Sequence, residues 1–414
     1  MHTDLLKLRE MQFERLKVTV KHAYENVPFY HRKLDEAKIK PSDIRSIDDL
    51  PKLPLTTKEE IQESPLEDHV AANVDLGRCV KLQTSGSSGL SLTVLGDGRT
   101  ADFSRALWTR AYVANGLRIT DKMAFIWNPL TFRKNKGVSK LLSRKFISVF
   151  EDPEQQLKML EDYQPDVIRG YPSSLAVLAA ASRNRESRVR PRLVFTGAEL
   201  LNAKDRLDIE SAFQCDILDY YGCIEFSLLM WECTKHMGYH MNIDNVAIEF
   251  LKNGEVVGPG EEGEIVCTGL HSHVMPLIRY RLGDIGVPIE GRCSCGRTLP
   301  LMKVLRGRSD DLLTTLDGKF VFASAFFYDL LYNLSGRLEG IKQFRVIQEK
   351  RDRLLVQLVT KKGVTYDNVV LERARKDIQS FLGEGMQVDF QFLDEIKRDP
   401  TGKLRVFVSR IQRD

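Results

Sequence analysis

The chain has 414 residues, of which 43% are hydrophobic and 29% charged, and its formal net charge is +4. This length exceeds the size at which one hydrophobic core keeps growing, so we expect two or more packed units. Basic and acidic residues are interspersed, which excludes the basic stripe typical of nucleic-acid-binding proteins. The composition is that of an ordinary globular protein, without repeats or low-complexity tracts.

The N-terminal 27 residues carry apolar side chains at the spacing of an amphipathic helix, namely Leu5, Leu8, Met11, Leu16 and Val20. They lack the apolar segment of a signal peptide, and no apolar run in the sequence reaches membrane-spanning length. We therefore expect a cytoplasmic protein. In that compartment the seven cysteines indicate free thiols or metal ligands rather than disulfides.

Residues 1–80 predict helices interrupted by prolines, with a capped helix start in Thr56–Glu59, just before Ile61. From about 80 to 225, short apolar or β-branched runs alternate with helical stretches such as Leu157–Tyr163 and Ser173–Ser182. This alternation predicts a mostly parallel sheet covered by helices.

Antiparallel strands are expected next, because tight turns separate the apolar runs after Met237 and Asn253-Gly254 is a strong hairpin signal. After Asp310, two strand patterns, a charged helix from about Asn368 to Leu382 and a further strand predict a separate α+β unit.

Four loop segments carry residues that could bind a ligand or take part in catalysis. The Ser/Gly-rich run Thr84–Gly89 can surround phosphate oxygens with backbone N–H groups, although such runs are often plain turns. Tyr220–Glu225 and Tyr280–Asp284 each combine an aromatic ring with a carboxylate that can bind a cation or ribose hydroxyls. Asp399–Lys403 presents a lysine in a turn. Each segment alone is equally explained as a surface turn.

The ordered set of motifs resembles the core motifs of the adenylate-forming superfamily. The set comprises Thr84–Gly89, Phe195–Glu199, Tyr221–Glu225, Tyr280–Asp284, Gly307–Asp311 and Pro400–Lys403. Within that superfamily, the segments YENVPFYHRKLDEAKI, GYPSSL and CSCGR resemble the phenylacetate–coenzyme A ligase family and its CapK-like branch. The resemblance runs from about residue 20 to the end of the chain.

The resemblance implies an α/β fold in two parts. Residues 1–308 would form a large adenylation domain with mixed sheets, built from a helical N-terminal layer, parallel-sheet subdomains and an antiparallel subdomain at about 237–305. Residues 309–414 would form a small, mobile α+β lid domain.

The resemblance also implies a role for each motif residue. Thr84, Ser85, Gly86, Ser87, Ser88 and Gly89 would hold the phosphates of ATP, while Gly197, Ala198 and Glu199 would form a wall of the adenine pocket. Tyr221 would pack on the base beside Tyr220 and Gly222, and Asp284 would bind the ribose hydroxyls. Glu225 would hold Mg²⁺ and Lys403 would reach the α-phosphate and the substrate carboxylate, so these two are the expected catalytic residues. Arg308 and Asp310 would lie at the hinge, with Arg308 on the nucleotide side.

One position departs from the family pattern. The phosphate loop usually continues with Gly-Lys-Pro, whereas Leu90 follows Gly89 here, so one phosphate-binding cation is missing. An acyl pocket lined by Trp127, Tyr171 and Pro172 would favour an apolar or aromatic acid, but the same residues also suit packing between strand and helix.

A metal site is expected where Cys293 and Cys295 lie one residue apart and Cys233 and His240 lie upstream. Three thiolates and one imidazole would complete a tetrahedral structural zinc site. Reduced thiols without a metal are the alternative, and His236 could replace His240. The resemblance favours zinc, because in some relatives a cysteine before a Gly-aromatic-His step and a CxCGR loop bind zinc together.

The function that the resemblance implies is ATP-dependent activation of a carboxylic acid as an acyl-adenylate, followed by transfer of the acyl group to coenzyme A. Transfer to an amine, a hydroxyl or a carrier-protein thiol is an alternative acceptor step. A nucleotide-binding relative without catalysis is an alternative of another class. The expected partners are the acid, ATP with Mg²⁺ and the acyl acceptor, with no nucleic acid and no membrane; a homodimer stays open.

Overall fold

The computed structural model describes residues 2–83, 92–127, 143–149, 151–185, 187–198, 201, 203–306, 312–318, 320–322, 327, 341–360, 363–396 and 407–411. Several predicted site residues lie outside these ranges, namely Thr84, Ser85, Gly86, Ser87, Ser88, Gly89, Leu90, Glu199, Arg308, Asp310 and Lys403. Their roles stay predictions.

The N-terminal layer is helical, as the sequence predicts. Asp4 caps the first helix by accepting a hydrogen bond from the Leu6 N–H, and a capping box between Thr57 and Glu60 starts the third. The helices of this layer are α1 (Leu5–Asn26), α2 (Pro28–Glu36), α3 (Lys58–Glu63) and the 3-10 turns η1 (Pro41–Asp43), η2 (Ile47–Lys52), η3 (Leu66–His69) and η4 (Leu76–Arg78). Among the helices of the described residues, none has both the length and the apolar composition of a bilayer span.

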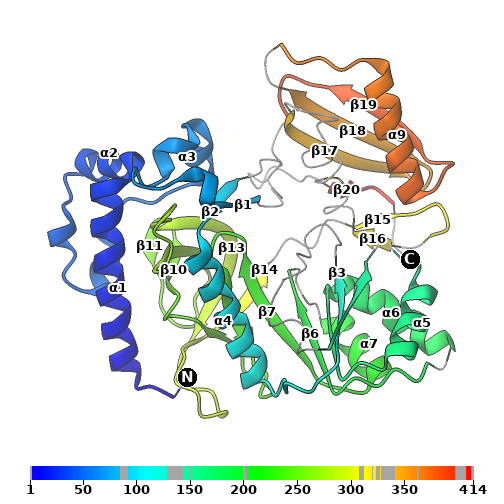
Figure 1. Ribbon diagram of the computed structural model, residues 1–414, viewed down its shortest axis with the longest axis horizontal. Helices are drawn as coiled ribbons and strands as arrows, with labels where there is room; N and C mark the ends of the chain where they lie inside the picture. The colour runs from blue at the N-terminus through cyan, green and yellow to red at the C-terminus, as the bar shows by residue number, and fades with distance from the viewer. Residues whose placement is uncertain are drawn as a thin grey trace.

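A mixed sheet forms the centre of the molecule (Figure 1). Its parallel strands, in spatial order, are β4 (Arg144–Ser148), β3 (Met123–Trp127), β5 (Val167–Gly170), β6 (Leu193–Gly197) and β7 (Ile217–Cys223). The helices that pack on them are α4 (Gly98–Ala114) on one face and α5 (Pro153–Tyr163), α6 (Pro172–Arg185) and α7 (Ala203–Phe213) on the other. The predicted parallel sheet with covering helices is thus confirmed.

Antiparallel strands extend the same sheet. They are β8 (Ser227–Glu232), β9 (Tyr239–Met241), β14 (Leu301–Arg306), β13 (Tyr280–Ile289), β12 (Gly263–Gly269), β10 (Val246–Lys252) and β11 (Glu255–Val256). Asn253 and Gly254, both with positive φ, form the predicted hairpin turn between β10 and β11. The antiparallel region starts earlier than the predicted 237, because β8 pairs directly with β7 and makes the two regions one continuous sheet of twelve strands.

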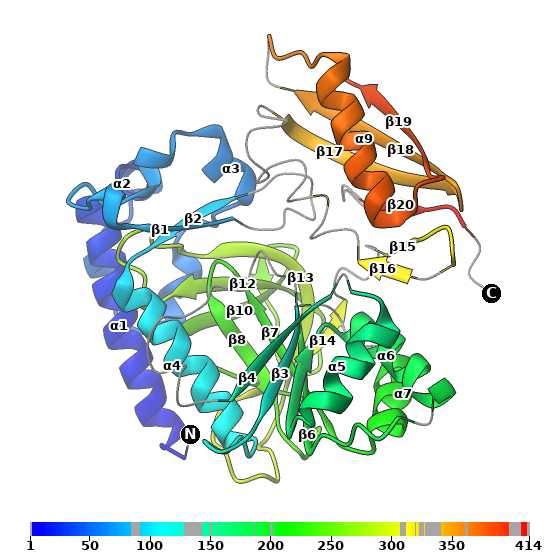
Figure 2. The ribbon, with the colours of Figure 1, turned by 45° about the vertical axis from the view of Figure 1, so that its right-hand side comes forward.

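The C-terminal segment has a hydrophobic core of its own, which includes Phe344, Leu354, Ile378 and Phe407. Its larger sheet and its helix lie to one side of the central sheet (Figures 1 and 2). The elements are β15 (Leu312–Thr314), β16 (Phe320–Phe322), β17 (Ile341–Lys350), β18 (Arg353–Thr360), α9 (Asn368–Leu382), β19 (Gln387–Phe392) and β20 (Phe407–Ser409). A separate hairpin pairs β1 (Val80–Gln83) with β2 (Thr93–Gly96).

A buried ion pair connects the N-terminal layer to the antiparallel strands. Arg279 donates Nε and Nη2 to the two carboxylate oxygens of Glu249, both at 2.9 Å, and Nη1 to the carbonyls of Pro51 and Leu53. Both charged residues are buried, and burial raises the pKa of Glu249. The arginine therefore neutralises a carboxylate that has little access to water.

Replacing this arginine tests how much the connection contributes to stability. Arg279→Met should lower the free energy of unfolding by about 3–5 kcal/mol, because Glu249 is left buried without its partner. Arg281→Met is the matched control, since Arg281 pairs with Glu264 but its side chain is 47% exposed, and it should cost less than about 1 kcal/mol. Urea denaturation measures both; equal losses in the two variants would contradict the assignment.

Candidate active site

The predicted nucleotide residues gather at one edge of the central sheet. Gly197 is the last residue of β6 and lies in register with Tyr220 on the neighbouring parallel strand β7. The carboxyl ends of parallel strands meet at one edge, where ligands of open α/β sheets bind. This edge brings together segments that are far apart in the sequence.

Two glycines of this edge occupy positions with no room for a side chain. A Cβ on Gly197 would lie 2.7 Å from the backbone oxygen of Tyr220, and a Cβ on Gly222 would lie 2.4 Å from the backbone oxygen of Ser227. Ala198 follows with a φ of 70°, which is uncommon for a residue other than glycine. The backbone at the strand ends is therefore closely packed and turns sharply away from the sheet.

The two tyrosines of the predicted wall have different environments. Tyr220 is buried, and its hydroxyl accepts a hydrogen bond from Asn115 Nδ2 at 2.9 Å. Its ring packs among Tyr112, Phe195 and Trp108 on the face covered by α4. Tyr220 thus supports the edge from inside, whereas its half-buried neighbour Tyr221 lies beside Asp284.

The Tyr221 hydroxyl donates a hydrogen bond to Asp284 Oδ2. Burial, together with the negative charge of Asp284, raises the pKa of Tyr221 well above its ordinary value, so the phenol keeps this proton. Within the described ranges, Asp284 Oδ1 accepts no hydrogen bond. The carboxylate is half-buried and follows Gly283, which has a φ of 80° and open space around it. Asp284 is thus oriented by the tyrosine and keeps one oxygen for a ligand.

Glu225 follows the end of β7 and is oriented from the same strand that carries Asp284. Tyr280 Oη donates a hydrogen bond of 3.3 Å to Glu225 Oε1, and both Tyr280 and Asp284 belong to β13. Burial, with the charge of Glu225, raises the pKa of the nearby Cys223 thiol well above its usual range. Cys223 therefore stays a protonated thiol beside the carboxylate, as expected for a packing residue.

The three residues of the predicted acyl pocket follow β3 and β5. Trp127 and Tyr171 stack with ring centroids 4.1 Å apart and an interplanar angle of 21°. Both are half-buried, whereas Pro172 is buried and begins α6. The structure thus brings the two rings together at the edge of the sheet and gives the proline a place in the helix start.

The four predicted metal ligands form a compact cluster. The ligand atoms of Cys233, His240, Cys293 and Cys295 all lie within 4.8 Å of one another. Cys233 Sγ lies 3.6 Å from Cys293 Sγ, and Cys295 Sγ lies 3.4 Å from His240 Nε2. Tetrahedral zinc with thiolate ligands requires sulfur separations of about 3.8 Å, so this donor set fits a zinc ion.

The histidine of the cluster is His240 and not the alternative His236. His236 Nδ1 lies 3.7 Å from Glu232 Oε2, and Arg206 also pairs with that carboxylate. The charge of Glu232 raises the pKa of His236. This histidine therefore belongs to an ion-pair network around the buried Glu232.

A buried carboxylate that the sequence did not identify links the metal cluster to the nucleotide edge. Asp219 accepts hydrogen bonds from Thr196 Oγ1 at 2.5 Å and from Tyr239 Oη at 2.6 Å. Thr196 precedes Gly197, and Tyr239 precedes the cluster residue His240. The only signal in the sequence is a charged residue inside the apolar strand CDILDYYG.

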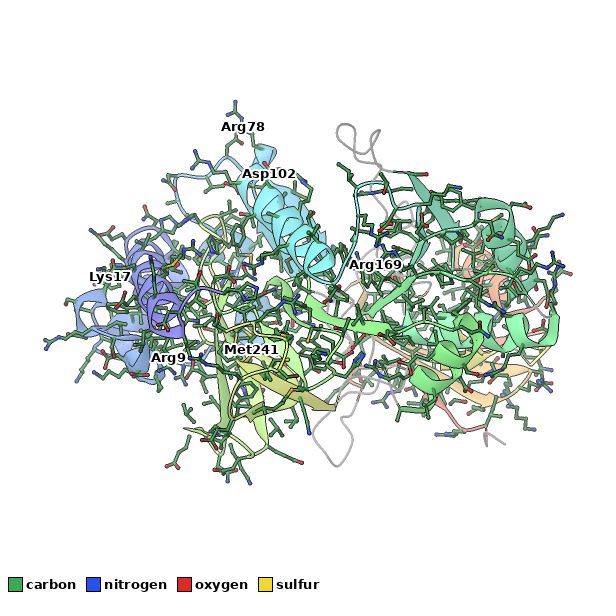
Figure 3. All side chains as sticks on the ribbon, turned by 90° about the horizontal axis from the view of Figure 1, so that it is seen from below. Arg9, Lys17, Arg78, Asp102, Arg169 and Met241 are labelled. Carbon is green, nitrogen blue, oxygen red and sulfur yellow. The ribbon has the colours of Figure 1, made fainter. Side chains whose placement is uncertain are left out.

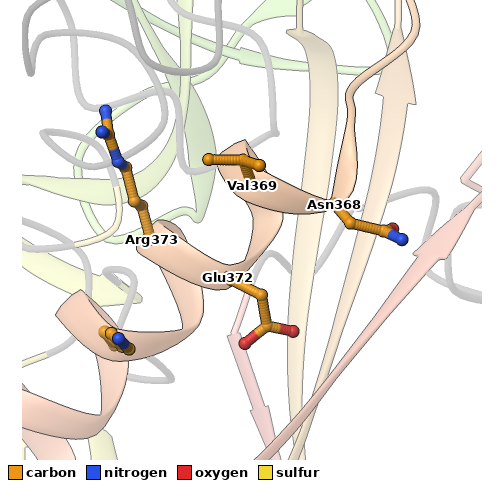
Figure 4. A pocket seen from close by; sticks show the side chains of 5 residues that line it. Asn368, Val369, Glu372 and Arg373 are labelled. Atoms are coloured by element: carbon orange, nitrogen blue, oxygen red, sulfur yellow. The ribbon is translucent and has the colours of Figure 1, made fainter.

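A surface hollow far from this edge offers no comparable chemistry. Figure 4 shows the hollow on α9, where all the lining residues belong to that single helix, namely Asn368, Val369, Glu372, Arg373 and Lys376. Among the described residues no other element lines the hollow, so the contacts that can be named come from one helix alone.

Comparison with known proteins agrees with this fold. The CapK C-terminal domain family model matches residues 314–410. The chain is 31% identical over 332 residues to phenylacetate–coenzyme A ligase of Escherichia coli (strain K12), covering 77% of this chain and 75% of the relative. It is 23% identical to protein CapK of Staphylococcus aureus, covering 99% of this chain and 90% of the relative.

Solved structures support the fold. A structure of 2-hydroxyisobutyryl-CoA ligase, in complex with 2-HIB-AMP and CoA in the thioesterification state, matches with a TM-score of 0.65 and 23% identity, covering 99% of this chain and 91% of that chain. The fold is that of the adenylate-forming CoA ligases. The relatives above show that the chain belongs to the phenylacetate–coenzyme A ligase family, in its CapK-like branch.

The metal assignment can be tested on the isolated protein. Protein purified without added zinc should contain about one equivalent of Zn²⁺, and Cys295→Ser should reduce the metal content sharply and lower thermal stability, because structural zinc contributes folding free energy directly. Adenylation should fall only as far as folding fails. Metal analysis and thermal unfolding with and without a chelator measure these effects.

Cys215→Ser is the control for this experiment, because Cys215 is a free thiol outside the cluster. It should keep the metal. If the parent protein were metal-free, fully active and equally stable in chelator, the four residues would be side chains that bind no metal.

Proposed function

We propose that the protein activates a carboxylic acid with ATP, forming an acyl-adenylate and pyrophosphate, and then transfers the acyl group to coenzyme A. The observation that carries this proposal is the pair of oriented carboxylates at one edge, Asp284 held by Tyr221 and Glu225 held by Tyr280. Family membership and the curated phenylacetate–coenzyme A ligases among the relatives support the same reaction.

In the proposed reaction, the substrate carboxylate attacks the α-phosphorus of ATP, and negative charge builds up on the phosphoryl oxygens. Asp284 would orient the nucleotide through the ribose hydroxyls, and the adenine would lie against Gly197, Ala198 and Tyr221. Glu225 would hold Mg²⁺, which supplies positive charge next to the phosphates.

The lid would complete the active site. Lys403, in the C-terminal segment, would bring one more positive charge to the α-phosphate in a site shielded from water, where such a charge is most effective. We place the domain boundary at residues 308 and 309, with Arg308 and Asp310 at the hinge. The separate hydrophobic core of the C-terminal segment supports a unit that can rotate as a body.

Lys403→Ala should lower pyrophosphate release from acid and ATP by on the order of a hundredfold, in the range for losing one preorganised charge. Binding of a preformed acyl-adenylate should survive. Lys376→Ala, which removes an exposed lysine from α9, is the control and should leave the rate unchanged. Near-parental adenylation by Lys403→Ala would remove this lysine from the mechanism.

Asp284→Ala tests the ribose assignment. The parent should bind ATP roughly ten- to a hundredfold more tightly than 2′,3′-dideoxy-ATP, because the analogue leaves the carboxylate without its hydrogen-bond donors. In Asp284→Ala this preference should disappear, while Tyr221→Phe, which keeps the carboxylate, should retain most of it. Equilibrium binding of both nucleotides gives the answer. If Asp284→Ala bound the two nucleotides just as the parent does, the assignment would be wrong.

An acceptor other than coenzyme A is a second candidate for the transfer step. The matches to the CapK C-terminal domain over residues 314–410 and to protein CapK, neither of which names coenzyme A, support this candidate. Mass spectrometry of the product formed from the adenylate with and without coenzyme A separates the two. Formation of the coenzyme A thioester of the acid supports coenzyme A as the acceptor. An adenylate that coenzyme A does not consume supports another acceptor.

A further inference from the structure

One arginine occupies a position that the strand pattern reserves for apolar side chains. Arg169 lies on β5 in register with Phe125 on β3 and Phe195 on β6, and Phe195 is in register with Leu218 on β7. Phe125, Phe195 and Leu218 are buried members of the core that faces α4. Residues in register on neighbouring strands point to the same face of a sheet, so a guanidinium interrupts an otherwise apolar row.

Aromatic rings surround this guanidinium. Its central carbon lies 4.3 Å from the ring centroid of Trp108 on α4, 4.8 Å from that of Trp127 and 5.4 Å from that of Tyr112. Figure 3 labels Arg169 beside α4, at the end of the parallel strands. Cation–π contacts occupy the faces of a guanidinium, whereas its N–H donors lie in the plane and remain able to bind a carboxylate through two bonds.

A partner for these donors is missing in the part of the chain that the structure describes. Arg169 is half-buried there and forms no ion pair with an acidic residue. Next to it, Tyr112 is only 6% exposed, and no group of the described residues meets its buried hydroxyl in good hydrogen-bond geometry. Burial raises the pKa of Tyr112 to about 12, whereas the charge and the side-chain interaction of the adjacent Arg169 lower it, so the two groups lie close together.

An unpaired cation and an unpaired hydroxyl are both expensive to hold away from water. A methionine or leucine at position 169 would continue the apolar row at no such cost. The arrangement therefore fits an anionic group that the described residues do not supply and that accepts hydrogen bonds from both side chains. Trp127, which contacts Arg169, also stacks on Tyr171 of the predicted acyl pocket.

We propose that Arg169 determines specificity by binding a second anionic group of the acid, so that the preferred substrate carries a carboxylate at the end remote from the one that is activated. Tyr112 would donate a further hydrogen bond to the same group. This inference rests on the proposed adenylation and defines its substrate class. It modifies the expectation of a purely apolar or aromatic acid, because the rings would cover the body of a substrate whose far end is charged.

The test compares matched acids in ATP–pyrophosphate exchange, which reports adenylation alone. The pairs are glutarate with pentanoate and terephthalate with 4-methylbenzoate, each a symmetric diacid and the monoacid of the same shape. The parent should show a kcat/KM at least about tenfold higher for the better diacid than for its partner, in the range of a charge-assisted hydrogen bond. The preference should appear in KM more than in kcat, because the group is remote from the reacting atoms.

Arg169→Gln should lower kcat/KM for the diacid by roughly ten- to a hundredfold and leave the monoacid and the KM for ATP within about twofold. Arg169→Lys should retain part of the preference, and Arg169→Met should reverse it in favour of the monoacid. Arg105→Gln is the control, because Arg105 also lies on α4 but is exposed and pairs there with the exposed Asp102. This control should match the parent.

A binding measurement makes the result independent of turnover. Trp108 and Trp127 lie next to the guanidinium, so glutarate added to the protein with AMP should change tryptophan fluorescence, and Arg169→Gln should abolish the change. Circular dichroism and thermal unfolding confirm that each variant is folded.

Three outcomes would overturn the inference while adenylation stands. The first is that the parent prefers the monoacids. The second is that Arg169→Gln slows both members of a pair equally, which would assign the guanidinium to the reacting carboxylate or to packing. The third is that Arg169→Gln raises the KM for ATP with every acid, which would assign the guanidinium to a phosphate. Failure of the parent to catalyse exchange with any acid, together with absence of glutarate binding, would overturn the proposed function and this inference together.

Discussion

The buried carboxylate of Asp219 fixes the strands on which the active-site edge depends. It accepts hydrogen bonds from Thr196 on β6 and Tyr239 on β9, and its backbone N–H donates to Glu232 on β8. Burial raises the pKa of Asp219 to about 6. Since this is above the unfolded value, the ionised form lowers stability by a few kcal/mol once the pH rises above that pKa. In return, one side chain connects the strands at which the sheet changes from parallel to antiparallel.

The positions of the candidate ligand-binding residues follow from this arrangement. Thr196 and Asp219 each precede a residue of the edge, Gly197 and Tyr220, and side chains alternate between the two faces of a strand. Holding the first pair from one face therefore fixes the second pair on the other. Tyr239 extends the same connection to His240 and so to the metal cluster. A metal held by this cluster would thus support the edge that carries the predicted nucleotide residues without touching a substrate.

The sequence predicted features whose cause is local. The helix Asn368–Leu382 and the turn at Asn253-Gly254 were correct, because capping and turn chemistry depend on neighbouring residues. The early start of β8 was missed, because SLLMWE is a continuous apolar run without alternation and only its pairing with β7 identifies it as a strand. The cysteine–histidine cluster was predicted from ligand types, whereas the roles of Asp219 and Arg169 depend on distant elements.

Arg169 and Asp219 show why the partners of a buried charge matter more than its presence. Both interrupt apolar strands, and they belong to adjacent rows that face opposite sides of the sheet. Asp219 is satisfied by hydroxyl donors from the protein, so its environment is complete and its role is structural. Arg169 has aromatic rings on its faces but, in the described part of the chain, no anion at its N–H groups. A guanidinium that the described residues orient but do not neutralise is the arrangement expected where a ligand completes the site. Asp219 thus stabilises the fold, whereas the role that we propose for Arg169 is to select the substrate.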